Sequence, residues 1–406
     1  MVKIAILGFG TVGSGVAEVL TGHEQHIADK LKDLIQLKYI LDVRDFPGSP
    51  FAPCFIKDFS VIENDPEVDI VVETIGGAGV ALDFTRRALT AGKSVVSSNK
   101  ELVAAHGYEL LQLAKEKNVS YLFEASVGGG IPILRPLSQC LAANDILEIS
   151  GILNGTTNYI LTRMIRSGLT FDAALKEAQE KGYAERDPAA DIEGHDACRK
   201  ICILSAIAFG RHVYPDQVPT EGITGVTLAD VAYADGAGKK IKLLGRAMRD
   251  PATGKLRVYV APHLVDVSNP LSGVEDVFNA ITVKGDATGD VMFYGKGAGK
   301  YPTASAVVAD VIDAAKHLNA RKYLDWGPGG ADVTEGIDSL ESRWYVRVRE
   351  EAGPALPERL AVKTFLARAG APAGETAFIT MAPLTRGELD EKLTGLEVLS
   401  AFRVAE

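Results

Sequence analysis

The stretch "VKIAILGFGTVGSGVAEVL", residues 2–20, decides the fold of the N-terminal half. A short apolar run leads into a glycine turn and then into an apolar pattern with helical spacing. Gly8, Gly10 and Gly13 spell G-x-G-x-x-G, in which the first glycine permits a tight turn, the second lets the backbone approach a pyrophosphate, and the third lets helix and strand pack closely. Because the motif follows a predicted strand and opens a predicted helix, it predicts a dinucleotide-binding unit, and a glycine turn that serves packing alone is the alternative.

The strand and helix pattern continues along the N-terminal part of the chain. Amphipathic helical runs, such as 81–91 and 108–117, separate apolar runs that are typical of buried strands. Alternation of this kind predicts an α/β fold with a Rossmann-type, doubly wound parallel sheet. The further strands are expected at 37–43, 70–73, 94–97 and 120–123.

Composition limits the class of protein. The chain has 406 residues, which suggests more than one domain, and 47% of them are hydrophobic, which excludes a disordered or fibrous protein. A net charge of −10 without a basic run argues against nucleic acid or an anionic membrane as partner and favours small molecules. No apolar run reaches the length of a membrane span, the chain opens directly on a predicted strand, and the cysteines lack zinc spacing. We therefore expect a cytoplasmic protein with reduced thiols.

The end of the second predicted strand bears on the choice of cofactor. An acid there holds the ribose 2′-hydroxyl of NAD, whereas a 2′-phosphate requires an arginine. The segment "ILDVRD", residues 40–45, offers both Asp42 and Arg44. Arg44 and Lys57 together would form a cationic pocket for a 2′-phosphate, which favours NADP over NAD. A solvated surface pair is the alternative reading of these two cations.

A lysine follows another predicted strand in "VVSSNKELV", residues 95–103. Ligands of open α/β sheets bind outside the carboxyl ends of the strands. We therefore expect Lys100 to project toward the nicotinamide or its substrate, although most lysines are only surface charges.

Two loops in the middle of the chain are candidate binding sites. Gly128, Gly129 and Gly130 make an extended loop whose carbonyls cannot all pair in a sheet, so that some are available to a monovalent cation, unless the loop only joins two domains. Further on, "EISGILNGTTNYILTRM", residues 148–164, reads as a strand, a turn and a helix entered through Thr156. Amides and a hydroxyl at such a turn can hold an amino acid's carboxylate, and simple helix capping is compatible with this role.

The stretch "GYAERDPAADIEGHDACRK", residues 182–200, carries many charges and runs directly into apolar sequence. In a helix, Asp196 and Lys200 lie four residues apart on one face, acid first, which favours an ion pair. The apolar residues that follow carry Lys200 toward the interior, where it becomes a candidate proton donor and acceptor for the oxidation of an alcohol. Glu185 and Asp191 supply negative charge for a substrate ammonium group. A solvated acidic loop with a surface salt bridge is the alternative.

Several of these segments together resemble homoserine dehydrogenases. They occur in that family's order over about Met1–Asp332, and the combination is specific because several long motifs coincide. They are "GFGTVGSG" (8–15), "SSNKELVA" (97–104), "FEASVGGGIPI" (123–133), "GILNGTTNYIL" (151–161), "GYAERDPAADIEGHDACRK" (182–200) and "YGKGAGKYPTASAVVAD" (294–310).

The resemblance implies NAD(P)-dependent interconversion of L-homoserine and L-aspartate 4-semialdehyde, on the pathway to threonine, methionine and isoleucine. It implies Lys200 as proton donor and acceptor, with Lys100 beside it and Asp196 supporting it. By the same resemblance, substrate is bound by Glu185, Asp191, Asp196, Gly155, Thr156 and Tyr183. The resemblance implies cofactor contacts at Phe9, Thr11, Val12, Lys100 and Gly299. These join the residues predicted above from the motif and the second strand, namely Gly8, Gly10, Gly13, Arg44 and Lys57. A sodium or potassium ion is held by Glu124, Val127, Gly129 and Ile131.

The resemblance also implies a domain organisation. Residues 1–131 form the Rossmann domain, completed by a late helix near 299–318, and residues 132–298 form an α+β domain for substrate binding and dimerisation, so a homodimer or higher oligomer is expected. Residues 340–406 resemble an ACT-like α+β domain, and we expect it to be short and truncated, without the second strand of that fold. The family's effector turn is replaced by "EEAGPAL", residues 350–356, which leaves regulation by threonine open.

Two other functions are compatible with a Rossmann unit. One is a different amino-acid or semialdehyde dehydrogenase, but a phosphorylating semialdehyde enzyme needs a nucleophilic cysteine in an electropositive loop, and none of the cysteines has that setting. The other is a non-catalytic nucleotide-binding sensor, which would have no need of the acid and lysine cluster.

Overall fold

The computed structural model describes residues 1–319, 324–349 and 355–405. The chain forms two compact units. The first comprises Met1–Ile146, Cys202–Pro215 and Gly285–Val333, and the second comprises Leu147–Ile201, Asp216–Lys284 and Thr334–Glu406. The expected domain limits at 131, 298 and 340 stay a prediction, and in this division the segment from 340 onward falls in the second unit.

The first unit is built on a parallel sheet. Its strands follow the order β3-β2-β1-β4-β5-β6, the order of a doubly wound dinucleotide-binding sheet. The predicted fold class is therefore confirmed for this half, although the sixth strand is only two residues long. The strands are β1 (Val2–Leu7), β2 (Ile35–Leu41), β3 (Phe55–Ile56), β4 (Ile70–Glu73), β5 (Ser94–Ser97) and β6 (Tyr121–Leu122).

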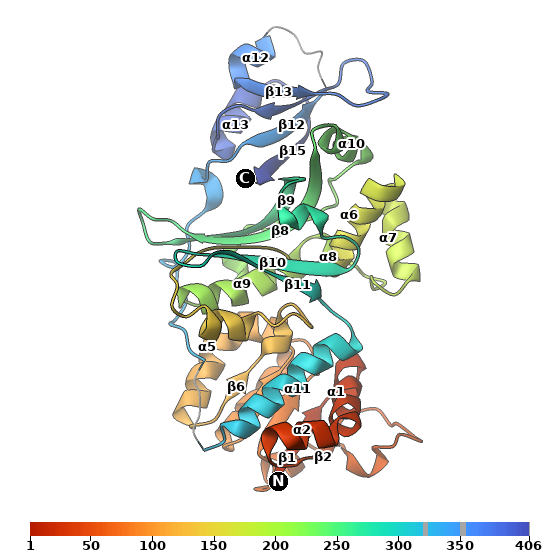
Figure 1. Ribbon diagram of the computed structural model, residues 1–406, viewed down its shortest axis with the longest axis vertical. Helices are drawn as coiled ribbons and strands as arrows, with labels where there is room; N and C mark the ends of the chain where they lie inside the picture. Colours follow the sequence, from red (N-terminus) through yellow and green to blue (C-terminus); the bar gives the residue numbers. More distant parts are fainter. Residues whose placement is uncertain (320–323, 350–354, 406) are drawn as a thin grey trace. The chain divides into compact units, whose positions relative to one another are not determined.

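Helices cover this sheet. The helices of the unit are α1 (Thr11–Gly22), α2 (Glu24–Leu31), α3 (Ser60–Glu63), α4 (Gly79–Thr90), α5 (Lys100–Glu116) and α11 (Lys300–Lys316). α11 comes from late in the chain and lies along α1 (Figure 1). Ala304, Val307 and Val311 of α11 are fully buried in one core with Val16 and Ala17 of α1. This packing is the reason why a late segment belongs to the N-terminal unit.

The second unit is built on a mixed sheet. Within it the strands run in the order β10-β7-β8-β9-β15-β12-β14-β13. β7 and β9 pair antiparallel with β8, whereas β15 pairs parallel with β9. The strands are β7 (Ile146–Ile152), β8 (Lys239–Arg249), β9 (Leu256–Asp266), β10 (Phe278–Gly285), β12 (Trp344–Val348), β13 (Val362–Leu366), β14 (Thr376–Thr380) and β15 (Val398–Ala405), while β11 (Gly289–Lys296) falls in the first unit.

The helices of the second unit carry most of the predicted substrate residues. Asn154 caps α6 by accepting a hydrogen bond from the Thr157 amide, and Thr227 and Asp230 form a capping box at α10. The helices are α6 (Gly155–Ser167), α7 (Phe171–Glu180), α8 (Ala189–Ile192), α9 (His195–Phe209), α10 (Leu228–Gly236), α12 (Ala355–Leu360) and α13 (Arg386–Leu393). The division between the units falls within α9, after Ile201.

The C-terminal segment has the element order β12, α12, β13, β14, α13, β15. The expectation that its second strand is missing is wrong, because Val362–Leu366 forms β13 and pairs antiparallel with β14. β13 lies at the edge of the sheet with mostly exposed side chains, so its sequence lacks the buried alternation that marks an inner strand. Residues 350–354, which make up most of the proposed effector turn, lie outside the described residues.

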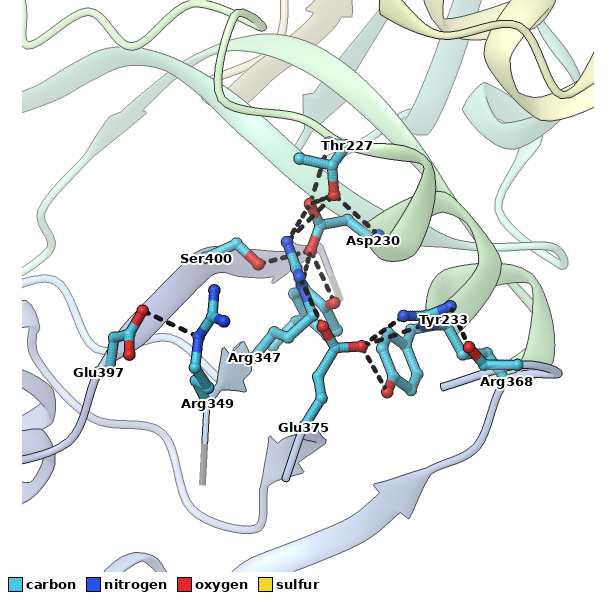
Figure 2. Close-up of polar contacts among 11 residues, drawn as sticks. Thr227, Asp230, Tyr233, Arg347, Arg349, Arg368, Glu375, Glu397 and Ser400 are labelled. Atoms are coloured by element: carbon cyan, nitrogen blue, oxygen red, sulfur yellow. Dashed lines mark hydrogen bonds and ion pairs between the residues drawn. The ribbon is translucent and has the colours of Figure 1, made fainter. Parts of the chain in front are cut away.

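A buried polar network fixes this segment to α10 (Figure 2). Asp230 is fully buried and accepts hydrogen bonds from the Tyr345 hydroxyl at 2.9 Å, from Nε of Arg347 at 2.8 Å and from Ser400. Arg347 also pairs with Glu375 at 3.0 Å. Every buried charge here has an opposite partner, so the C-terminal strands and α10 are held as one structure.

No helix in residues 1–319, 324–349 and 355–405 is both long and apolar enough to cross a membrane.

Candidate active site

The glycine turn after β1 has the geometry that its motif predicts. Gly8 has a φ of +89°, a conformation that favours glycine. A Cβ atom on Gly13 would lie 1.9 Å from the carbonyl oxygen of Gly8, so helix and strand can approach only without a side chain there. Gly10 caps α1 with no side-chain hydrogen bond, and a Cβ on it would meet nothing within 4 Å. The amides of Thr11 and Val12 open this helix beside open space, which fits a pyrophosphate.

Two residues that the sequence did not single out support this turn. Thr74 donates from its hydroxyl to the carbonyls of Leu7 and Gly8, each at 2.9 Å. Glu73, fully buried at the end of β4, accepts hydrogen bonds from the Ser97 hydroxyl at 2.6 Å and the Ile75 amide at 2.8 Å. Burial raises the pKa of Glu73, and these hydrogen bonds oppose the shift. Glu73 is the last residue of β4 and Thr74 follows it, and this position at the carboxyl end of a predicted strand is the signal that would have found them.

The acid at the end of the second strand and its arginine are joined. Asp42 accepts a hydrogen bond from the Phe9 amide at 2.7 Å and pairs with the Arg44 guanidinium at 2.9 Å. The Arg44 hydrogen bonds hold the pKa of Asp42 well below its usual range, against the effect of burial. Lys57 lies close by, with its ammonium 2.6 Å from the Arg44 carbonyl and 2.8 Å from Asp45. The structure therefore brings Asp42, Arg44 and Lys57 together next to the glycine turn.

Lys100 is the first residue of α5, and only two residues separate it from the end of β5. Its neighbour Asn99 caps the helix by accepting the Leu102 amide at 3.1 Å and donates to the Gly77 carbonyl at 2.7 Å. These contacts fix Lys100 at the carboxyl end of the parallel sheet, as expected. It belongs to the first unit, whereas Lys200 belongs to the second.

Gly299 caps the N-terminus of α11 with a φ of +122°, a value that favours glycine. The next residue, Lys300, forms an ion pair with Glu18 of α1 at 2.8 Å. A Cβ on Gly15 of α1 would meet the Lys300 side chain at 2.9 Å. Gly299 therefore lies where the late helix begins its contact with α1, the helix that follows the glycine turn.

The glycine loop predicted to hold a cation is tightly packed. Gly128 and Gly129 have φ values of +73° and +53°, and a Cβ on Gly129 would lie 2.5 Å from the Gly297 carbonyl oxygen. The Glu124 carboxylate accepts the amides of Ile133, Leu134 and Arg135 at 2.6 to 2.9 Å. The side chain of Glu124 is therefore occupied, so only main-chain oxygens remain for the predicted set of Glu124, Val127, Gly129 and Ile131. No cluster of three or more His, Cys, Asp or Glu side chains suited to a metal occurs in the described part of the chain.

Lys200 and Asp196 form the expected ion pair on α9. Nζ of Lys200 lies 2.6 Å from Oδ2 of Asp196, and the two side chains are 9% and 5% exposed. The ammonium also donates to the Leu153 carbonyl at 2.8 Å. A buried, paired lysine of this kind is not a solvated surface salt bridge, so the alternative reading of this stretch does not apply.

Asn154 connects the charged residues of this site. Its side-chain nitrogen donates to Asp191 at 2.7 Å and to Asp196 at 2.8 Å, while its oxygen caps α6. Burial raises the pKa of Asp191, and the negative charge of Asp196 adds to the shift. Sequence reasoning placed Asn154 only in a turn, and the polar cap directly before Gly155 was the available signal.

The remaining predicted substrate residues surround the start of α6. Gly155 packs so closely on the loop before β10 that a Cβ would lie 2.7 Å from the Val277 carbonyl oxygen. Thr156 donates to the Tyr183 carbonyl at 2.7 Å, and the Tyr183 side chain is 44% exposed. Glu185 is exposed. The structure therefore gathers Asn154, Asp191, Asp196 and Lys200 closely, with Tyr183 and Glu185 more open to solvent.

The fold and these sites define a class. A doubly wound sheet with a glycine turn that has open space at Gly10 fits a dinucleotide, and a separate buried lysine paired with an acid can exchange a proton. The protein is an oxidoreductase with a nicotinamide-dinucleotide-binding domain.

The chain belongs to the homoserine dehydrogenase family. The family model of homoserine dehydrogenase matches residues 132–312, and the model of the homoserine dehydrogenase NAD-binding domain matches residues 8–124. The homoserine dehydrogenase of Neisseria gonorrhoeae is 41% identical over 87% of this chain and 83% of its own length. The enzyme of a Synechocystis species is 46% identical over 77% of this chain and 73% of its own.

Solved structures support the same family. A homoserine dehydrogenase from Thiobacillus denitrificans matches with a TM-score of 0.90 and 34% identity over 100% of this chain and 98% of its own. A hyperthermophilic archaeal homoserine dehydrogenase in complex with NADPH matches with a TM-score of 0.67 and 29% identity over 80% of this chain and 99% of its own. These findings do not favour another Rossmann dehydrogenase or a non-catalytic sensor.

Proposed function

We propose that this chain interconverts L-homoserine and L-aspartate 4-semialdehyde, with Lys200 transferring the proton. The buried Lys200–Asp196 ion pair carries the proposal, because it places a proton donor among residues suited to an amino acid. A nicotinamide cofactor, when bound, supplies or accepts the hydride. The amides at Gly10, Thr11 and Val12 would hold its pyrophosphate, and Gly8, Phe9, Gly13, Lys100 and Gly299 complete the proposed cofactor set.

In the direction of aldehyde reduction, the Lys200 ammonium gives a proton to the carbonyl oxygen as hydride reaches the carbon. In the reverse direction, the neutral amine accepts the hydroxyl proton. Asp196 stabilises the ammonium form at 2.6 Å, and the Leu153 carbonyl at 2.8 Å fixes its direction. Lys100 is proposed to assist at the reacting oxygen.

The two ends of the substrate require opposite charges. Asp191, with Glu185 at the more exposed side, is proposed to bind the substrate ammonium. The start of α6 at Gly155 and Thr156, together with Tyr183, is proposed to bind the carboxylate, because helix amides attract anions. Asn154 aligns Asp191 and Asp196 by donating to both.

Replacing the lysine tests the reaction. Lys200→Ala is expected to lower kcat by about 10²–10⁴-fold in a steady-state assay with L-homoserine, while the affinity for nucleotide, measured by fluorescence titration, stays close to that of the parent. Lys176→Ala, an exposed lysine on α7, serves as control. Turnover at the parental rate in the Lys200 variant would exclude the proposed role.

NADP is the proposed cofactor. Arg44 is 59% exposed and follows β2, where a 2′-phosphate would arrive. Lys57 is 50% exposed and follows β3, and its ammonium lies 2.6 Å from the Arg44 carbonyl. Because Arg44 also neutralises Asp42, removing it both takes away a cation and frees an acid. Arg44→Ala is therefore expected to raise KM for NADP by about tenfold or more and to leave KM for NAD unchanged or lower. An equal change for both cofactors would contradict this assignment.

Four further expectations belong to the same proposal: a bound cation, a homodimer, an ACT-like domain and a cytoplasmic location. A monovalent cation is proposed at the carbonyls of Glu124, Val127, Gly129 and Ile131, and assays in sodium, potassium and tetramethylammonium chloride test it. A homodimer formed through the sheet of residues 132–298 is proposed, with light scattering as its test. The element order of residues 340–406 supports an ACT-like domain, and no disulfide joins the cysteines, which is consistent with a cytoplasmic location.

A further inference from the structure

Arg403 is a buried cation of the last strand, β15. It is 4% exposed, and it lies opposite Trp344 of β12 and His263 of β9 in the sheet. Its guanidinium lies 4.4 Å from the centre of the Trp344 ring and 5.5 Å from that of Tyr259. These cation–π contacts stabilise the side chain but do not neutralise its charge.

Arg403 has no anionic partner in the described part of the chain. Its hydrogen bonds go to neutral acceptors, the Leu340 carbonyl at 3.3 Å and the Ser342 hydroxyl at 2.8 Å. Burial lowers the pKa of Arg403, and the charge of Glu221 offsets the shift only in part. His263, which lies opposite Arg403, carries no charge, since burial lowers its pKa to about 3 and leaves the ring neutral.

Arg347, on the neighbouring strand β12 of the same sheet, differs from Arg403 in its partners. Arg347 is equally buried, but Asp230 and Glu375 pair with it at 2.8 and 3.0 Å (Figure 2). Buried charges are normally paired, because an isolated charge loses its hydration without compensation. Arg403 lacks such a pair among the residues that the structure describes, so its counter-charge is expected from a bound ligand.

A pocket gives access to Arg403. It has a volume of about 340 Å³, near the lower end for small-molecule sites. Arg386, the first residue of α13, stands at this pocket with its guanidinium 5.6 Å from the Trp344 ring and an ion pair to Asp390 at 3.0 Å. Trp344, Glu221 and Asp338 also line the pocket.

We propose that this pocket binds a small oxyanion, a carboxylate or a phosphate, with Arg403 as its buried partner and Arg386 as a second cation. The site lies outside the residues proposed for catalysis, so it does not depend on the reaction assigned above. Glu221 and Asp338 are exposed and also line the pocket, so a carboxylate that carries an ammonium group gains a further contact.

Calorimetric titration of the full chain in a buffer of low chloride tests the proposal with three probes. Inorganic phosphate and acetate represent the two oxyanions, and glycine adds an ammonium group to the carboxylate. Saturable binding of at least one probe is expected. Arg386→Ala, which removes the second cation, is expected to weaken the affinity several-fold. Arg403→Gln, which removes the buried cation, is expected to weaken it at least tenfold.

Arg349→Ala is the matched control, since this arginine of the same segment is 65% exposed and pairs with Glu397. The Arg349→Ala variant should bind the probes with the same affinity as the parent. Circular dichroism reports whether Arg403→Gln is folded, and the exposed Arg386 carries the test if it is not. Absence of saturable binding for all three probes in the millimolar range, or equal affinity in the parent and Arg386→Ala, would overturn the proposal.

Discussion

Arg347→Met is expected to destabilise the second unit strongly. The substitution keeps much of the side-chain volume but removes the guanidinium that pairs with Asp230 at 2.8 Å. Asp230 is fully buried, so its carboxylate would remain charged without its main partner (Figure 2). Removing one partner of a buried pair costs roughly 3–5 kcal/mol. Because Ser400 and Tyr345 still donate to Asp230, we expect the lower end, about 3 kcal/mol.

The loss should depend on pH. In the parent, burial would raise the pKa of Asp230, but hydrogen bonds, first from Arg347 and then from Ser400, hold it below the ordinary value. This group therefore adds stability above its unfolded pKa, about 3.9, and that stability is lost as the pH falls through the folded pKa. Without Arg347, burial raises the pKa of Asp230 instead. The difference in stability between parent and variant should be largest near pH 7 and should shrink toward pH 4.

Urea unfolding followed by tryptophan fluorescence at several pH values measures this difference. Arg349→Ala, which breaks an exposed ion pair, should leave the midpoint unchanged. Asp230→Asn combined with Arg347→Met should recover part of the stability, because position 230 then no longer carries a buried charge, while Glu375 keeps its ion pair with Arg368. The reasoning fails if Arg347→Met unfolds at the parental midpoint, or if its deficit is the same at pH 7 and pH 4.5.

Two further predictions concern Gly155 of α6 and Lys242 of β8, which both contact the loop between β9 and β10. Gly155→Ala would place a Cβ 2.7 Å from the Val277 carbonyl oxygen. We expect thermal unfolding to show a stability loss on the order of 1–3 kcal/mol, and a steady-state assay to show a higher KM for the amino-acid substrate. An unchanged KM would contradict the assignment of Gly155 to the substrate site. Lys242 is 1% exposed, it donates to Asn158 at 3.0 Å and to the Val274 carbonyl, and burial lowers its pKa from 10.5 to about 8. Protonation of Lys242 therefore destabilises the folded state fully below pH 8, and this penalty is relieved as the pH rises toward 10.5. Between pH 7 and 10, the free energy of unfolding of the parent should rise by up to about 3 kcal/mol relative to that of Lys242→Met. Parallel stability curves for the two proteins would contradict this.

Features that depend on local spacing could be predicted from the sequence. The glycine turn and the i, i+4 pair of Asp196 and Lys200 follow from the periods of strand and helix, which act over a few residues. The edge strand β13 could not be predicted in the same way. Its side chains are largely exposed, so its conformation is decided by pairing with β14, which the local sequence does not show.

The sequence alone determined the doubly wound sheet, the place of the glycine turn and the charged face of α9, because each is written in the spacing of neighbouring residues. Only the tertiary structure decided that Asn154 aligns Asp191 with Asp196, and that Arg403 is buried without a counter-charge from residues 1–319, 324–349 and 355–405. Those contacts join residues distant in the chain, and which of them meet depends on how strands and helices pack over the whole unit. Burial then fixes the energetic weight of each charge, and a sequence does not report it.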